Sequence, residues 1–163
     1  MAESKQETEL VECDFRNTEQ RGQYFTLLGQ YMIHPMGGME RGLNNDEQQR
    51  LATYMTQHPD AHCFLLRRGK EYVGLSTCYE VFSTFHAMPY LYIHDIFVGA
   101  EYRNEGLGSL LIQKLIDWAR QHYCCKLTLE VRADNLPARR IYAKTGFKDV
   151  EPPMSFWTKD LLE

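Results

Sequence analysis

One strand-to-helix turn carries the residues of this chain that are best suited to chemistry. Its sequence is Val98-Gly99-Ala100-Glu101-Tyr102-Arg103-Asn104-Glu105-Gly106-Leu107-Gly108-Ser109. The N-terminus of a helix has unpaired backbone N–H groups and a partial positive charge, which together attract phosphate. Gly106 and Gly108 lack the Cβ atoms that would keep a phosphate from these amides, and Arg103 adds a cationic side chain. The turn therefore predicts a diphosphate site, while a plain turn with glycines for packing explains the same residues.

Two other phosphate motifs do not fit this turn. The Walker motif requires Lys and then Ser or Thr after its last glycine, whereas Gly108 is followed by Ser109 and Leu110. The dinucleotide motif requires three spaced glycines near the start of a strand-helix-strand unit, and here only Gly106 and Gly108 are present, past the midpoint of the chain. Both of these nucleotide-binding motifs are therefore disfavoured.

The turn resembles a known family when it is taken with a second segment. Arg103-x-x-Gly106-x-Gly108 is similar to the acetyl-CoA signature of the GNAT superfamily of N-acetyltransferases. The segment 135–147 resembles the second signature of that superfamily, Asn-x-x-Ala-x-x-x-Tyr-x-x-x-Gly-Phe. The resemblance extends from about Tyr90 to Phe147, and it implies an enzyme that transfers an acetyl group from acetyl-CoA to an amine.

The resemblance also implies which residues bind acetyl-CoA. Main-chain groups of Ile96 and Val98 would pair with the pantetheine arm like an added strand, and amides in the range 104–109 would hold the diphosphate. The thioester would then lie where two parallel strands separate, beside Glu130. The residues expected at acetyl-CoA are Ile96, Phe97, Val98, Arg103, Asn104, Glu105, Gly106, Leu107, Gly108, Ser109, Asn135, Ala138 and Tyr142.

Acetyl transfer to an amine needs groups that handle protons. An alkyl amine with a lysine-like pKa of about 10.4 is mostly protonated at neutral pH, so a base has to accept a proton. The thiolate that leaves is stabilised by an acid. Tyr142 matches the tyrosine of the second signature, and the resemblance implies that its phenol is this acid.

The identity of the base is open among three residues. The imidazole of His94 has an ordinary pKa of about 6.5, which suits proton acceptance near neutrality. Glu130 and Glu80 are the alternatives, and Asp95 is as well explained as a structural hydrogen-bond acceptor. Relatives that acetylate diamines carry a glutamate at the position of His94, so this histidine argues against polyamine specificity.

Hydrophobic periodicity predicts the elements that position these residues. In an ideal strand His94, Ile96 and Val98 share one face, unless a β-bulge shifts the alternation. The resemblance implies an α/β fold with a mixed, mostly antiparallel sheet, a central splayed pair of parallel strands and flanking helices. The expected elements are strand Glu9–Phe15, helix Glu19–Met32, loop His34–Gly42, a helix capped by Asn45 or Asp46 and ending before Pro59, strands Cys63–Arg67, Glu71–Tyr79 and Tyr90–Val98, helix Gly106–His122, strand Lys126–Val131, helix Asn135–Thr145 closed by Gly146, and strand Met154–Lys159.

Composition limits the class of protein. The 163 residues suit a single domain, 1–163. A net charge of −4 argues against a nucleic-acid partner, and no apolar run is long enough to span a membrane. Five cysteines without CxxC spacing disfavour a disulfide framework and a zinc site, so we expect no metal and a reducing, cytoplasmic location.

The acceptor is the part of the function that the sequence defines least. We expect the primary amine of a small molecule, with a peptide or protein amine, or a non-catalytic acetyl-CoA-binding module, as alternatives. Family resemblance also implies a homodimer. Residues expected to line an acceptor pocket are Tyr24, Tyr31, His34, Tyr79, Phe82, Phe85 and His86, although most of them are also explained as core.

Overall fold

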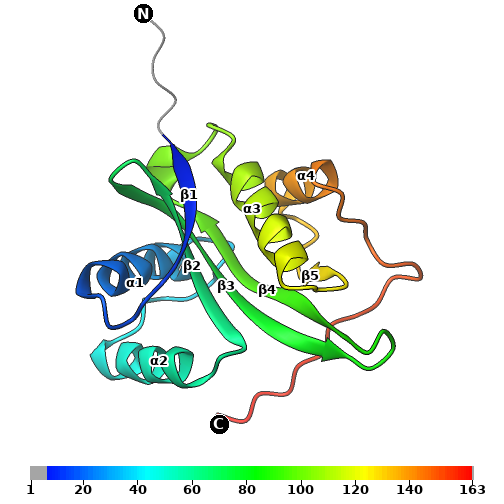
Figure 1. Ribbon diagram of the computed structural model, residues 1–163, viewed down its shortest axis with the longest axis horizontal. Coiled ribbons are helices and arrows are strands. Elements are labelled where there is room, and N and C mark those ends of the chain that lie inside the picture. Colours follow the sequence, from blue (N-terminus) through cyan, green and yellow to red (C-terminus); the bar gives the residue numbers. More distant parts are fainter. Residues whose placement is uncertain (1–6, 163) are drawn as a thin grey trace, which may run out of the picture.

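The computed structural model describes residues 7–162, in which a five-stranded sheet has helices on both sides (Figure 1). The strands are β1 (Thr8–Glu12), β2 (Ala61–Arg68), β3 (Glu71–Ser83), β4 (Met88–Val98) and β5 (Leu127–Leu129). The helices are α1 (Thr18–Ile33), α2 (Asn45–Gln57), α3 (Leu107–Gln121) and α4 (Leu136–Lys144), and a short 3-10 turn, η1 (Ala100–Tyr102), precedes α3. None of these helices is both long and apolar enough to cross a membrane.

The strands lie in the sheet in the order in which they occur in the chain, β1-β2-β3-β4-β5. The pairs β1–β2, β2–β3 and β3–β4 are antiparallel, and β5 runs parallel to β4. The parallel pair is short, because only Leu91–Ile93 of β4 is matched with Leu127–Leu129 of β5. This arrangement confirms the expected mixed sheet.

The two faces of the sheet carry separate apolar cores. Side chains alternate along β2, so Cys63 and Leu65 pack with α1 and α2, while Phe64 and Leu66 pack with α3. All four are at most 2% exposed, and burial of each large side chain contributes roughly 1.5–3 kcal/mol to folding. In Figure 1, α1 and α2 lie to the left of the sheet and α3 and α4 to the right.

Most helices begin near the expected residues, with one correction. The expected cap of α2, Asn45 or Asp46, is wrong, because Asn44 accepts a hydrogen bond from the backbone of Glu47. The Asn44 N–H in turn donates a hydrogen bond to the Glu47 carboxylate, which completes a capping box. At α4, the Asn135 side chain accepts from the Ala138 N–H at 3.3 Å and caps the helix.

A β-bulge at His94 changes the faces of β4. Thr77 of β3 pairs with Asp95, but the next residue, Cys78, pairs with Ile93, so His94 is an extra residue. The common face expected for His94, Ile96 and Val98 is therefore wrong. Ile96 and Val98 pack against the α3 core.

The expected last strand, Met154–Lys159, is wrong, because these residues form no strand and are exposed. No neighbouring strand supplies hydrogen bonds to them, and an isolated strand is not stable in water. The first and fifth strands also end earlier than expected, at Glu12 and Leu129. The described chain thus has an extended C-terminal segment outside the sheet.

Candidate active site

The site begins where β4 and β5 separate. β5 ends at Leu129, opposite Ile93, whereas β4 continues to Val98. Asp95–Val98 therefore pairs with β3 alone, and no other strand of residues 7–162 lies along its second edge. Unpaired N–H and C=O groups on such an edge can accept an extended ligand as an additional strand.

The strand leads directly into the glycine turn. Gly106 is the N-cap of α3 with φ +78°, a left-handed conformation that glycine adopts without strain. A Cβ on Gly106 would meet no heavy atom within 4 Å, so the space above this residue is open. The first-turn amides of Leu107, Gly108 and Ser109 have no carbonyl partners within the helix. The turn therefore has the backbone arrangement that suits an anion.

Gly108 has a role in packing. A Cβ there would lie 3.1 Å from Cδ1 of Ile141, so the missing side chain allows α4 to pack against α3. Packing is thus the structural reason for this second glycine. Of the two glycines Gly106 and Gly108, only Gly106 has open space where a Cβ would lie.

Two charged side chains of the turn contact other parts of the fold. The Glu105 carboxylate forms an ion pair with Arg68 of β2, which neutralises an acid that would repel phosphate. The Arg103 guanidinium lies over the ring of Phe97, 5.4 Å from its centroid, and Nη1 is 3.3 Å from Nε2 of His34. Arg103 Nε also lies 3.4 Å from the Val98 carbonyl, so the guanidinium lies between the end of β4 and the end of α1.

On the α1 side of the gap, His94 and Asp95 form a pair. His94 Nδ1 is 3.0 Å from Asp95 Oδ2, and the histidine side chain is 54% exposed. The hydrogen bond from the ring to Asp95 raises the pKa of His94 above its ordinary value, and it outweighs burial, which lowers the pKa. Tyr79 and Tyr92 each contact the His94 ring edge-on at 5.9 Å between ring centroids.

Two carboxylates give this side of the gap a negative charge. Asp95 is largely covered, with 18% of its side chain exposed, and Glu130 accepts a hydrogen bond from the Tyr92 hydroxyl at 3.3 Å. Burial, and then the charge of Asp95, raises the pKa of Tyr31. The structure therefore brings His94 and Glu130 together, with tyrosine rings around them.

Tyr142 lies on α4, at the α3 side of the sheet. Its ring packs against Phe147 with 5.9 Å between centroids, and the residue is partly buried in the α3 core. Burial, with a smaller electrostatic contribution from Tyr31, raises the pKa of Tyr142 to about 12. Tyr31 belongs to α1 and Tyr142 to α4, so a tyrosine on one side of the sheet helps to raise the pKa of a tyrosine on the other side. The phenol stays protonated throughout the neutral range.

Glu80, the third expected base, lies elsewhere. It pairs in register with Leu91, whose side chain belongs to the α3 core, so Glu80 is on the face opposite His94. Its Oε1 is 3.1 Å from Nε2 of His62, and Nδ1 of His62 is 2.6 Å from Glu12 Oε1. Sequence reasoning missed His62, although its alternation with Phe64 would have placed it on the α3 face.

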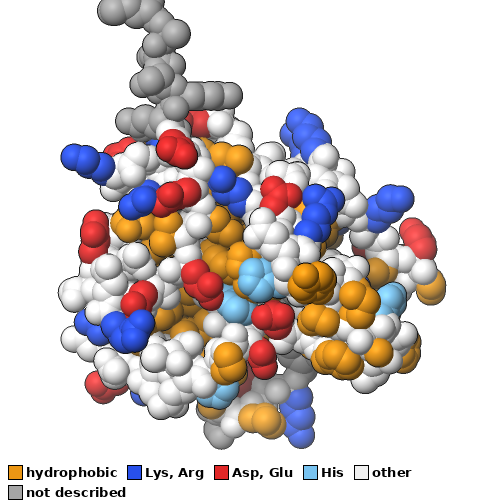
Figure 2. Space-filling model, viewed as in Figure 1, with side chains coloured by type: hydrophobic (Ala, Val, Ile, Leu, Met, Phe, Trp, Pro, Cys, Tyr) orange, Lys and Arg blue, Asp and Glu red, His pale blue; other side chains and the backbone are white. Residues whose placement is uncertain are grey.

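This three-residue cluster, Glu12–His62–Glu80, joins β1, β2 and β3. Carboxylates only accept hydrogen bonds, so both ring nitrogens donate and the histidine is an imidazolium. Burial lowers the pKa of His62, but the two carboxylates outweigh it and raise the pKa overall. Figure 2 shows histidine and acidic side chains gathered near the centre of this face of the molecule.

Several residues expected in the acceptor pocket do not line the gap. Tyr24 is fully buried, and its hydroxyl lies 2.6 Å from Thr77 Oγ1. Phe82, Phe85 and His86 lie at the end of the β3–β4 hairpin. Tyr31, His34 and Tyr79 remain in the surroundings of His94, Asp95 and Phe97.

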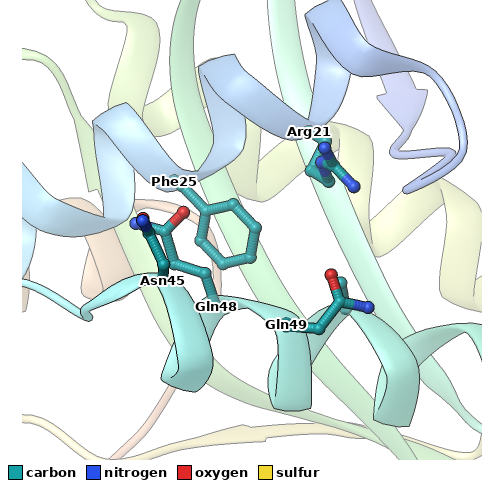
Figure 3. A pocket seen from close by; sticks show the side chains of 6 residues that line it. Arg21, Phe25, Asn45, Gln48 and Gln49 are labelled. Carbon is teal, nitrogen blue, oxygen red and sulfur yellow. The ribbon is translucent and has the colours of Figure 1, made fainter.

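A separate pocket lies between α1 and α2, but it has no group suited to acid, base or nucleophilic chemistry. Figure 3 shows Phe25 pointing between the helices, with Arg21 on one side and Gln49 on the other. Its remaining lining residues are Asn45, Gln48 and Ala52. Within residues 7–162, no group of three or more His, Cys, Asp or Glu is placed to hold a metal.

Known proteins resemble this chain over parts of their length. Streptothricin acetyltransferase A of Bacillus subtilis (strain 168) is 41% identical over 58 residues, which cover 36% of this chain and 34% of that protein. Thialysine N-epsilon-acetyltransferase of Bos taurus is 35% identical over 78 residues, 48% of this chain and 45% of that protein. Aminoglycoside N(6')-acetyltransferase type 1 of Acinetobacter baumannii is 28% identical over 48% of this chain and 53% of that protein. The chain spans between 24% and 59% of the length of such curated relatives.

Solved structures resemble the whole fold. A probable acetyltransferase has a TM-score of 0.81 at 18% identity, covering 95% of this chain and 99% of that chain. An aminoglycoside acetyltransferase from an uncultured soil metagenomic sample, in complex with sisomicin, has a TM-score of 0.75 at 14% identity, covering 93% and 95%. The acetyltransferase (GNAT) family itself matches residues 19–147. Because that match covers most of the chain and the fold agrees with it, the chain belongs to the acetyltransferase (GNAT) family.

Proposed function

We propose that this protein is an N-acetyltransferase that moves the acetyl group of acetyl-CoA to a primary amine of a small, cationic molecule. The observation that carries the proposal is the open edge of β4, Asp95–Val98, which ends in the glycine turn and has the His94–Asp95 pair at its other end. The edge, the anion-binding turn and a titratable pair thus follow one another along a single strand.

Acetyl-CoA would lie along this strand and supply the acetyl group as an activated thioester. The open edge at Ile96, Phe97 and Val98 is suited to the amide groups of its pantetheine arm. The amides of 104–109 are suited to its diphosphate, since Gly106 leaves the space free. Asn135 and Ala138, at the start of α4, would border the other side.

His94 is the proposed base. It can accept a proton only in its neutral form, so its raised pKa predicts that activity develops above the ordinary pH range for histidine. Asp95 orients the ring and stabilises the charge that the ring acquires. Glu130 remains the alternative base, because it lies on the same side of the gap and contacts Tyr92. The position of Glu80 on the other face argues against it as a base.

Tyr142 would act on the leaving sulfur as a hydrogen-bond donor. Its pKa of about 12 exceeds that of an ordinary thiol, about 8.5, so complete proton transfer to the thiolate would be uphill by roughly 5 kcal/mol. A hydrogen bond avoids this cost and still stabilises the negative charge on sulfur. The proton lost from the amine can reach the sulfur later, through solvent.

The charge of the site favours a cationic acceptor. Asp95 and Glu130 provide negative charge on the acceptor side, and the rings of Tyr79 and Tyr92 lie next to His94 there. Proteins that resemble this chain are named for streptothricin, thialysine and aminoglycosides. The five cysteines, all unpaired, are consistent with a cytoplasmic, reducing setting.

The test is release of free thiol from acetyl-CoA by the purified protein with a panel of amines. We expect turnover with small amines, and a lower KM for an amine with an additional cationic group, such as a guanidinium, than for one of similar size without it. That difference in KM should shrink as salt is added, because salt screens the carboxylates. Faster turnover with peptides would favour the peptide alternative. Binding of acetyl-CoA without thiol release from any amine would favour the non-catalytic module.

A further inference from the structure

Two hydrogen-bond donors face each other at the end of α1. The Met36 N–H donates to Nδ1 of His34 at 3.1 Å, so this nitrogen carries no proton and the ring N–H is at Nε2. Nε2 in turn lies 3.3 Å from Nη1 of Arg103, and a guanidinium can only donate. The two N–H groups therefore converge without an acceptor between them. A negatively charged oxygen placed there would accept from both.

The backbone fixes these two donors in position. His34 is the C-cap of α1, and its carbonyl accepts from the Gly37 N–H at 2.8 Å. A Cβ on Gly37 would lie 2.1 Å from the Tyr31 carbonyl oxygen, so glycine allows this turn to close tightly. Nε of Arg103 lies 3.4 Å from the Val98 carbonyl, which anchors the guanidinium at the end of β4. The arrangement is therefore formed before an anion binds.

The donors lie on the α1 side of the sheet. The ring of Phe97 is 5.4 Å from the Arg103 guanidinium and 6.2 Å from the His34 ring, measured from its centroid. Phe97 packs in the core beneath α1, whereas the amides proposed to hold the diphosphate begin α3. Figure 1 shows α1 and α3 on opposite sides of the sheet. An anion between His34 and Arg103 therefore fits the acceptor better than the diphosphate of acetyl-CoA.

We propose that the acceptor is an amino acid with a basic side chain, whose carboxylate binds between His34 and Arg103 while its side-chain amine reaches His94. This inference rests on the proposed acetyltransferase function and names its substrate class. Phe97, beside the two donors, lies two residues beyond Asp95 on β4, which corresponds to about 6.5 Å along the strand. An α-amine is attached next to the carboxylate and cannot bridge this distance, but a side-chain amine can.

The charges at the two ends of this surface match such an amino acid. The carboxylate meets the donors at one end, and ammonium groups meet Asp95 and Glu130 at the other. The amide of the same amino acid is more cationic and has no carboxylate. A site that only attracts positive charge therefore prefers the amide, whereas a site with an anion subsite prefers the acid.

Free lysine and lysinamide, compared as acceptors in the thiol-release assay, test the proposal. We expect kcat/KM for lysine to exceed that for lysinamide by about 10-fold or more, through a lower KM, because charge-assisted hydrogen bonds are lost with the amide. Mass spectrometry of the product should place the acetyl group on the side-chain nitrogen. Titration of both compounds into the protein–CoA complex should give the same order of affinity without turnover. A preference for lysinamide, or acetylation of the α-amine, would overturn the proposal.

Two substitutions of His34 separate its donor from its role in the turn. In His34→Asn the side-chain oxygen can still accept from the Met36 N–H, but nothing replaces Nε2, so the lysine-to-lysinamide ratio should fall to about 1. In His34→Gln the side-chain NH₂ can take the place of Nε2, and most of the ratio should be retained. Arg103→Gln should lower the ratio as His34→Asn does. Ratios that stay at the parent value in both His34→Asn and Arg103→Gln contradict the subsite.

Calorimetry with acetyl-CoA identifies the source of the anion. We expect nearly the same acetyl-CoA affinity in His34→Asn and in the parent. A lower acetyl-CoA affinity with an unchanged lysine-to-lysinamide ratio would assign the donors to a phosphate of the cofactor and overturn the proposal. Failure of every amine to release thiol would instead contradict the acetyltransferase function. In that case tighter binding of lysine than of lysinamide would still support the carboxylate subsite, and equal binding would overturn it.

Discussion

The two halves of β4 differ in their neighbours and therefore in what their residues can do. Leu91 and Ile93 lie between β3 and β5 and are at most 2% exposed, so they belong to the core. Asp95–Val98 lies beside β3 alone, and it carries a charged side chain and a free edge. His94, the bulge, stands between the halves. Loss of one neighbouring strand thus opens both the backbone and the side chains of a central strand to a ligand.

The sharpest test of the open half is Tyr142→Phe. The variant should lower kcat about 10²–10³-fold and leave acetyl-CoA affinity nearly unchanged, because it removes one hydrogen-bond donor and little volume. Single-turnover kinetics with a good amine would measure the effect on chemistry. The contrasting variant is Tyr24→Phe, which loses a buried hydrogen bond to Thr77 and should reduce stability by about 1 kcal/mol without reducing kcat. If Tyr142→Phe behaves like Tyr24→Phe, Tyr142 is a core residue.

The glycine turn, at the far end of the open half, is tested by Ser109→Asp. An acid in the first turn of α3 suits the helix dipole, so the variant should fold at least as stably as the parent. The new carboxylate should repel the diphosphate and weaken acetyl-CoA binding by about 10–100-fold. Calorimetry with acetyl-CoA measures this change, and Ser109→Asn is the neutral control of the same size. Equal affinity in the two variants would place the diphosphate elsewhere.

A smaller effect is expected at the bulge, from His94→Gln. In the parent, kcat/KM should fall as the pH drops through the pKa of His94, which Asp95 raises above 6.5, because the protonated ring cannot accept a proton. Glutamine does not titrate, so this acidic limb should vanish and kcat/KM at high pH should drop. The measurement is kcat/KM against pH with one amine. If the acidic limb of the pH profile keeps its position and steepness in the variant, His94 is not the base. Glu130 would then be the candidate for that role.

The sequence predicted the central part of the fold because local signals there agree with the tertiary structure. Apolar spacing from Leu107 onward predicted α3, and the glycine at 106 predicted its start. The helix expected from Asn135 begins at Leu136, with the Asn135 side chain as its cap. The two signatures predicted the family. These features depend on residues close together in the chain, which a sequence displays directly.

Other features depended on neighbours that the sequence does not show. The bulge at His94 is defined by pairing with Thr77 and Cys78 of β3, so strand alternation alone assigned His94 to the wrong face. Met154–Lys159 has strand propensity without a partner strand, and propensity alone does not form a strand. The placement of Arg103 over Phe97 is a tertiary contact that the signature pattern did not indicate.

The Glu12–His62–Glu80 cluster implies that stability and activity favour different pH. Because the pKa of His62 is raised, its contribution to stability is fully present below pH 6.5. That contribution is lost as the pH rises through the pKa of His62 in the folded protein. The hydrogen bond from His62, working against burial, lowers the pKa of Glu12, so its share is complete above 4.5 and is lost as the pH falls below that value. The ion pairs that link β1, β2 and β3 are therefore strongest between pH 4.5 and pH 6.5. In this pH range His94 is protonated and cannot serve as a base. Mild acid would therefore strengthen this link between the strands while it keeps the proposed base in its inactive, protonated form.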